Sequence, residues 1–249
     1  MRFTTTVSLV SLAITWAIAS HLAQSDAFPG PLAVGAKIFQ ESANGELWVH
    51  LGATFGRVVV AFGLAWAVGI GIGAALGRSD RLDCWFWPWL NTFLNMPALV
   101  IIVICYLGLG MSELAAVLAV VINKAPLIAT NVRDGVRQFE TRYDEFASIY
   151  RLSWTQKVRL IWLPQLEPFL FTALRTGLSL TWKIILVVEL LGRSSGIGFQ
   201  IHLYFQLFEV DMILAYALSF MIAMQLIELS AVRPLEHRVQ QWRKDGQLV

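Results

Sequence analysis

The chain has 249 residues, of which 57% are hydrophobic and only 14% are charged, and its mean hydropathy is +0.62. A soluble domain usually carries about 25% charged residues, so this composition argues against a soluble protein and indicates one embedded in a membrane. The formal net charge of +2 gives no reason to expect a nucleic-acid partner.

The apolar segments predict an all-α, polytopic membrane protein of about six transmembrane helices, in a single domain over residues 1–249. A spanning helix needs about 20 predominantly apolar residues. The predicted spans cover residues 7–23, 47–76, 86–107, 114–131, 166–191 and 212–230. The first of them could instead be a cleaved signal peptide, because Ala-Ile-Ala-Ser and Ser-Asp-Ala are possible cleavage sites.

The second span carries two sets of glycines at four-residue spacing. Small residues at this spacing let two helix backbones approach closely in lipid, so we expect a tight helix contact. The same span holds an arginine, which we expect to extend toward the membrane surface. The glycines are Gly52 and Gly56, then Gly69, Gly73 and Gly77, and the arginine is Arg57.

The third span is interrupted by Asn95, Met96 and Pro97. A proline removes a helix hydrogen bond, and irregular backbone at membrane depth is tolerated only next to protein or a water-filled cavity. Two interpretations stay open, a packing kink or a bend that lines a translocation pathway.

Polar and ionisable residues occur inside later spans. Asn123 and Lys124 lie in the fourth, and Lys183 and Glu189 lie in the fifth. A buried lysine costs about 2.5–3.5 kcal/mol on insertion scales, so it should face protein or water. Lys124 could pair with Glu189, or it could face a pathway that carries anions.

Residues 133–165 form the one long polar segment and predict a helix-turn-helix. Apolar residues recur at three- and four-residue steps, which is typical of one face of a helix. Ser153 is a candidate N-cap for the second helix, which we expect to stop near Leu163 and Pro164. Such a segment suits docking onto a soluble partner. The apolar stripe consists of Phe139, Tyr143, Phe146 and Tyr150.

This segment resembles the EAA loop of the permease subunits of binding-protein-dependent ABC importers. The chain has Glu145, Phe146 and Ala147, followed by Leu163 and Pro164 at the family spacing. It departs from the family at Phe146, where alanine is usual, and at Arg151, where glycine is usual. Because glycine permits positive φ at a helix C-terminus, Arg151 predicts a turn of different shape.

Other segments are similar to the nitrate, sulfonate and taurine branch of these permeases. They are Leu76 to Ser79, Gly108 to Gly110, Gly177 to Gly192 and Ser195 to Gly198. The resemblance implies a type I ABC importer permease fold, with the first helix retained. It also implies a cytoplasmic loop that couples to an ATPase through Tyr143, Glu145, Phe146, Ala147, Tyr150, Arg151, Leu152, Leu163 and Pro164.

The resemblance further implies partners. Such permeases act as homodimers or paired permeases with two cytoplasmic ATP-binding subunits and an outer, periplasmic or lipid-anchored, solute-binding protein. ATP and Mg would be bound by the ATPase, and this chain would hold no cofactor. Closure of the ATPase would pull the cytoplasmic loops together and open the pathway alternately to each side.

Lysines and arginines set the expected orientation. With both termini in the cytoplasm, Arg78, Arg81, the 133–165 loop and the basic tail lie inside, and the outer loops hold only Lys37 and Arg193. This arrangement follows the positive-inside rule. The expected location is the bacterial inner membrane.

Catalytic motifs are absent from the sequence. None of the five lysines follows a glycine, so no P-loop is present, and the four histidines are scattered. The two cysteines, Cys84 and Cys105, lack metal-ligand spacing and should pack as small apolar residues. We therefore expect a subunit that is not an enzyme, rather than a membrane-embedded enzyme.

The expected substrate is a small anion such as nitrate, a sulfonate, taurine or bicarbonate. The pathway candidates are Asn95, Met96, Pro97, Asn123, Lys124, Lys183 and Glu189. Two alternatives stay open: a permease for a vitamin precursor or other small organic solute, and a membrane scaffold that recruits a cytoplasmic partner without transport.

Overall fold

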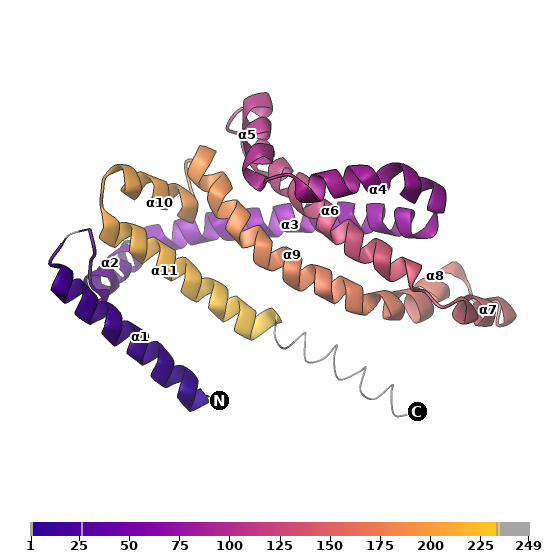
Figure 1. Ribbon diagram of the computed structural model, residues 1–249, viewed down its shortest axis with the longest axis horizontal. Helices are drawn as coiled ribbons and strands as arrows, with labels where there is room; N and C mark the ends of the chain where they lie inside the picture. The colour runs from indigo at the N-terminus through magenta and orange to yellow at the C-terminus, as the bar shows by residue number, and fades with distance from the viewer. Residues whose placement is uncertain (1, 26, 233, 235–249) are drawn as a thin grey trace. The chain divides into compact units, whose positions relative to one another are not determined.

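The computed structural model describes residues 2–25, 27–232 and 234, and these residues form helices and no strand (Figure 1). The basic tail that the sequence places after residue 232 lies almost wholly outside them. The elements are α1 (Arg2–Ala23), α2 (Pro31–Asn44), α3 (Glu46–Arg78), α4 (Asp80–Asn95), α5 (Ala98–Leu109), α6 (Glu113–Arg137), α7 (Thr141–Ile149), α8 (Trp154–Lys157), the π-helical turn η1 (Val158–Trp162), α9 (Leu163–Gly192), α10 (Ile197–Gln206), α11 (Val210–Ile227) and the π-helical turn η2 (Glu228–Val232).

Three described helices are long and apolar enough to cross a membrane by themselves, and the number is up to five if each of two bent helix pairs is one span. The three are α3, α6 and α11. The bent pairs are α4 with α5, and the helix from Trp154 to Gly192 with α10. Residues Val10–Ala23 of α1 form a shorter apolar helix. The predicted first span is therefore not among the three helices that are at least 18 residues long and apolar enough to cross a membrane.

The chain divides into two compact units. Unit 1 comprises residues 1–55 and 189–226, and unit 2 comprises residues 56–188 and 227–249. Two polar contacts join α2 to α11 in unit 1. Tyr216 donates to Glu41 at 2.6 Å, and Lys37 lies 3.6 Å from Asp211.

In unit 2, α3 packs closely on α6 through one of the two predicted glycine sets. A Cβ atom on Gly69, Gly73 or Gly77 would lie only 2.5–2.6 Å from the nearest atom of α6. The expected tight contact is therefore present at these three positions. It is absent at Gly52 and Gly56, where a Cβ atom would meet no described atom within 4 Å.

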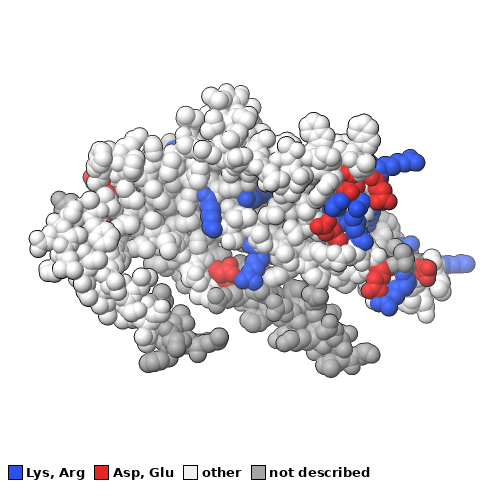
Figure 2. Space-filling view, viewed as in Figure 1, with Lys and Arg blue, Asp and Glu red and all other residues white. Residues whose placement is uncertain are grey.

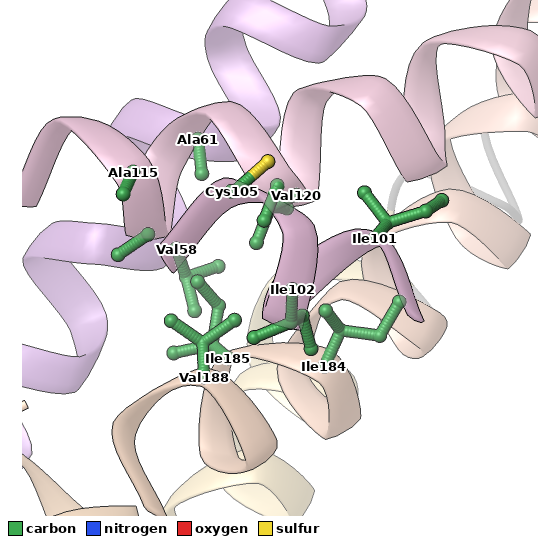
Figure 3. Packing of buried hydrophobic residues seen from close by; sticks show 12 residues of the cluster. Val58, Ala61, Ile101, Ile102, Cys105, Ala115, Val120, Ile184, Ile185 and Val188 are labelled. Carbon is green, nitrogen blue, oxygen red and sulfur yellow. The ribbon is translucent and has the colours of Figure 1, made fainter. Parts of the chain in front are cut away.

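A core of buried apolar side chains joins α3, α5, α6 and α9 in unit 2 (Figure 3). Small residues of α6 allow the other helices to approach, and Ile102, Ile185 and Val188 fill the space between them. Cys105 packs here as an apolar residue, while Cys84 is exposed, and both thiols are free.

Arg57 differs from its prediction. Its side chain is buried, and its guanidinium forms hydrogen bonds of 2.8 and 3.0 Å with the Glu113 carboxylate at the start of α6. The expectation that Arg57 extends toward the membrane surface is wrong, because a carboxylate within unit 2 satisfies its charge.

The break at Asn95 to Pro97 is far more than a kink. Helix α4 ends at Asn95, α5 begins at Ala98, and their axes differ by 97°. Proline has no N–H to continue the helix, and it forces the preceding residue into an extended conformation. Met96 accordingly has φ −75° and ψ 128°.

Candidate functional site

Helix α7 ends in a Schellman motif whose critical position is Arg151. The Leu152 N–H donates to the Ala147 carbonyl at 3.0 Å, and the Arg151 N–H donates to the Ser148 carbonyl at 3.1 Å. These are the two bonds that define the motif. Arg151 lies in the left-handed region at φ +48°.

The predicted change of turn shape at Arg151 is therefore wrong. The arginine adopts the backbone conformation that a glycine would adopt, at the steric cost of a Cβ atom near the following carbonyl. The turn keeps the geometry of a glycine-terminated helix, so the departure from the family motif changes the side chain and not the path of the chain.

One face of α7 is apolar and exposed. Phe146 is 49% exposed and Tyr150 is 65% exposed, and their ring centroids lie 4.3 Å apart. Tyr143 and Ile149 are also exposed, and so is Glu145, whereas Ala147 is buried. The exposed apolar residues Tyr143, Phe146, Ile149 and Tyr150 are called the elbow face below.

Phe139 does not belong to the elbow face, although the periodicity placed it there. It lies before α7 and packs against the apolar core formed by α3, α6 and α9. The helix starts at Thr141, so Phe139 is outside the helical register from which the stripe was read.

Specific contacts hold the segment that contains α7 and α8. The Gln165 side chain in α9 accepts a 3.1 Å hydrogen bond from the Glu140 N–H just before α7. Ser153 caps α8 and forms a capping box with Gln156, which confirms the predicted N-cap. The Arg78 guanidinium at the end of α3 lies 4.1 Å from the centre of the Trp162 ring, within cation–π distance.

The predicted stop at Leu163 and Pro164 is wrong. The chain passes from α8 through the π-helical turn Val158–Trp162 into α9 without interruption. In this turn the Leu163 N–H donates to the Val158 carbonyl, five residues earlier. This wider hydrogen-bond pattern just before Pro164 accompanies the continuation of the helix past a residue that has no N–H to donate.

A charge cluster that the sequence reading missed ties α4 to α6. Arg133 forms hydrogen bonds with both carboxylate oxygens of Asp83, and its guanidinium lies 4.0 Å from the centre of the Trp87 ring. Arg137 lies 2.9 Å from both Asp80 and Asp83. Figure 2 shows blue and red side chains next to one another in the region that α4 and the end of α6 occupy in Figure 1.

The cluster lies outside the predicted apolar spans, near the ends of α4 and α6. The hydrogen bond from Arg133 holds the pKa of Asp83 below its ordinary value, against the opposing effect of burial. The sequence signal was available in Asp80 and Asp83 three residues apart and Arg133 and Arg137 four residues apart, which places each pair on one helix face.

The predicted pathway residues do not form one group. In unit 2, Lys124 is only 6% exposed and makes no hydrogen bond or ion pair with another described residue of that unit. Asn123 beside it is half-buried. Asn95 is exposed and bonds within its own helix, to the Asn91 carbonyl at 2.8 Å, while Met96 packs against the core.

Glu189 lies in a buried polar network of unit 1. Its Oε2 atom accepts hydrogen bonds of 2.9 Å from the Thr54 hydroxyl and from the Gly198 N–H. The His50 Nδ1 atom accepts a 3.0 Å bond from the Gly196 N–H. These bonds hold the loop between α9 and α10 on the start of α3, so Glu189 serves this loop.

Comparison with known proteins identifies the chain's relatives. A family model described as binding-protein-dependent transport system inner membrane component matches residues 67–237. The taurine transport system permease protein of Escherichia coli is 26% identical over 96% of this chain and 88% of its own length. The bicarbonate transport system permease protein of Synechococcus elongatus is 31% identical over 69% of this chain and 62% of its own length.

Solved structures show the same fold. A chain of the MetNI methionine ABC transporter in an inward-facing conformation superposes with a TM-score of 0.67 at 18% identity, over 80% of this chain and 98% of that chain. The helical architecture is thus the type I ABC importer permease fold. With the family model matching well over half of the sequence, this chain belongs to the family of inner-membrane components of binding-protein-dependent transport systems.

Proposed function

We propose that this permease couples solute transport to a separate ATPase through the elbow face on α7. The single observation that supports this most is the pairing of exposed aromatic residues with a rigid backbone turn. Phe146 and Tyr150 present apolar area on the surface of unit 2, while Ala147 and the Schellman bonds hold the helix end. An apolar helix face of this kind fits a groove in a soluble partner.

The location of the segment fits a role in coupling. Gln165 connects the chain before α7 to α9, and Arg78 connects the end of α3 to Trp162. A displacement of the elbow by its partner would therefore act on two long helices. The proposed orientation places this segment and both termini in the cytoplasm of a bacterial cell, with the chain in the inner membrane.

The proposed assembly follows from the family. Two permease chains, as a homodimer or a pair, would bind two ATPase subunits, which hold ATP and Mg, and would receive solute from an outer binding protein. This chain itself would be non-catalytic and hold no cofactor. The matched relatives are named as permease proteins of a taurine and a bicarbonate transport system.

The proposed substrate is a small anion. Relatives are named for the transport of taurine, bicarbonate and nitrate. The chain carries two lysines within its spans, Lys124 and Lys183, and we place both on the pathway together with Asn95 to Pro97 and Asn123. We assign Glu189 to support of the outer loop, because its carboxylate is fully buried and hydrogen-bonded.

The test is co-purification of the ATPase with elbow variants. Phe146→Asp places a charge in the centre of the proposed contact, and losses at interface centres commonly exceed 2 kcal/mol, or about 30-fold in affinity. The ATPase should be lost from the purified complex. Phe146→Leu keeps the apolar contact and is the matched control, which should retain it.

The outcome that contradicts the proposal is equally clear. If Phe146→Asp retains its ATPase and full solute-stimulated ATP hydrolysis, the elbow face is not the coupling surface. Folding is checked by the elution of the permease as a single species, so loss of the partner is separated from loss of the fold.

A further inference from the structure

The middle of α9 carries a polar stripe on its exposed side. Between residues 172 and 183, every exposed residue is polar, and the apolar residues are buried or half-buried. At 3.6 residues per turn, the exposed residues fall within an arc of about 100°. They are Thr172, Arg175, Thr176, Ser179 and Lys183, called the α9 stripe below.

This pattern is the reverse of a lipid-facing surface. On α3 the exposed residues Val60, Leu64 and Val68 are apolar, as expected next to hydrocarbon. On α11 the same holds for Met221 and Ile222. The α9 stripe interrupts an apolar helix with two cationic and three hydroxyl side chains, and polar groups inside membrane spans face protein or water.

Packing fixes which side of α9 is exposed. Ala173, Ile185 and Val188 are fully buried in the cores of unit 2. A Cβ atom on Gly177 would lie 3.0 Å from the Phe62 ring. Rotation of α9 about its axis that buried the stripe in unit 2 would remove Ala173, Ile185 and Val188 from these cores.

Two hydroxyls of the stripe are available to a ligand. Thr172 and the buried Thr181 donate to carbonyls four residues earlier, at 2.9 and 2.8 Å, which is how hydroxyls are usually satisfied in membrane helices. The hydroxyls of Thr176 and Ser179 make no such bond among the described residues. They lie between the cations Arg175 and Lys183, which are eight residues or about 12 Å apart along the axis.

We infer that the α9 stripe is an aqueous wall of the translocation pathway and selects a small oxyanion. Lys183 and Arg175 would attract the anion at two levels, and the Thr176 and Ser179 hydroxyls would donate hydrogen bonds to its oxygens between them. An anion would bind only weakly at each of the two cations, so it could move from one to the other past the hydroxyls. The inference rests on the proposed function and specifies its solute path.

Arg175 and Lys183 lie inside the predicted span of residues 166–191. A cation with no role in transport would be expected near a membrane surface, where long side chains reach the headgroups.

The test is the reactivity of a cysteine at Ser179 in the complex co-expressed with its ATPase and binding protein. The exposed native cysteine is removed by Cys84→Ser, and the buried Cys105 is kept. Ser179→Cys is compared with Leu64→Cys on the apolar face of α3. Two water-soluble methanethiosulfonate reagents of similar size serve as probes, one bearing a sulfonate and one bearing a quaternary ammonium.

The expected result is labelling of Ser179→Cys and none of Leu64→Cys. The sulfonate reagent should react about tenfold faster than the cationic one, because charged clefts change association rates by about 10- to 1,000-fold. Adding Lys183→Gln should bring the two rates together, and Lys183→Arg should leave the preference in place.

Two results would overturn the inference. If Ser179→Cys is as unreactive as Leu64→Cys with and without nucleotide, the stripe contacts protein or lipid. If it reacts equally with both reagents, the stripe is wet but not anion-selective. Retention of the ATPase by the same preparations tests the coupling proposal separately, so failure of one is distinguishable from failure of the other.

Discussion

At the scale of single residues, Arg151 shows how a sequence departure can leave a backbone unchanged. An arginine stands at the C′ position where glycine is favoured, and its φ is +48°. The two Schellman hydrogen bonds stabilise the turn despite this conformation. The side chain is exposed and lies at the base of the elbow, where an ATPase surface could meet its charge.

The thermal stability of Arg151 variants should therefore follow how readily the new residue adopts the left-handed backbone conformation. A left-handed conformation costs an ordinary residue about 1–2 kcal/mol, and more for a β-branched residue. We expect Arg151→Gly to retain or raise the thermal stability of the purified complex and Arg151→Val to lower it. Equal midpoints for the glycine and valine variants would show that the turn is not held in the left-handed conformation.

At the scale of elements, the glycine row of α3 sets how closely α6 can pack. Gly69, Gly73 and Gly77 each leave room for an α6 atom that a Cβ would displace. Without water to drive helices together, close backbone approach is a main source of association energy in lipid. The row therefore fixes the geometry of the two helices that connect to the elbow and the charge cluster.

Two neighbouring glycines of α3 provide a matched pair. A Cβ on Gly73 would lie 2.5 Å from the Ala129 carbonyl oxygen, whereas on Gly71 it would meet no described atom within 4 Å. Gly73→Ala should lower the yield of monodisperse permease and its melting temperature, since overpacking costs about 1–3 kcal/mol. Gly71→Ala should be neutral or stabilising. Identical behaviour of the two variants in detergent would contradict the packing.

Sequence reasoning located the helices better than their ends. Hydropathy predicts spans because the lipid-exposed residues dominate their composition, and the glycine row and the Ser153 cap were readable from spacing alone. The continuous passage through Pro164 was not, because the rule that a helix ends before a proline does not foresee a π-helical turn at this point. The Arg57–Glu113 pair and the Asp83–Arg133 pair were also missed, since each joins residues at least 50 positions apart.

At the scale of the whole molecule, we propose a membrane-embedded permease that depends on a separate ATPase subunit. The family match identifies the chain as an inner-membrane component of a transport system, and similar proteins are named as permeases of taurine and bicarbonate transport systems. The elbow face and the α9 stripe then supply the two proposed active surfaces, one for an ATPase and one for a solute. The elbow face is apolar but exposed, and the α9 stripe is polar but lies on a helix whose other residues are mostly apolar.

Contact between the elbow face and the ATPase subunit is tested most directly by photo-cross-linking in living cells. A photoreactive phenylalanine analogue replaces Tyr150, which follows the last residue of α7 and is 65% exposed, in cells that express the whole transporter. The account predicts a covalent adduct between the permease and the cytoplasmic ATPase subunit. The account would be contradicted by absence of that adduct together with labelling of an Ile149→Cys variant by a membrane-impermeant reagent added outside the cell.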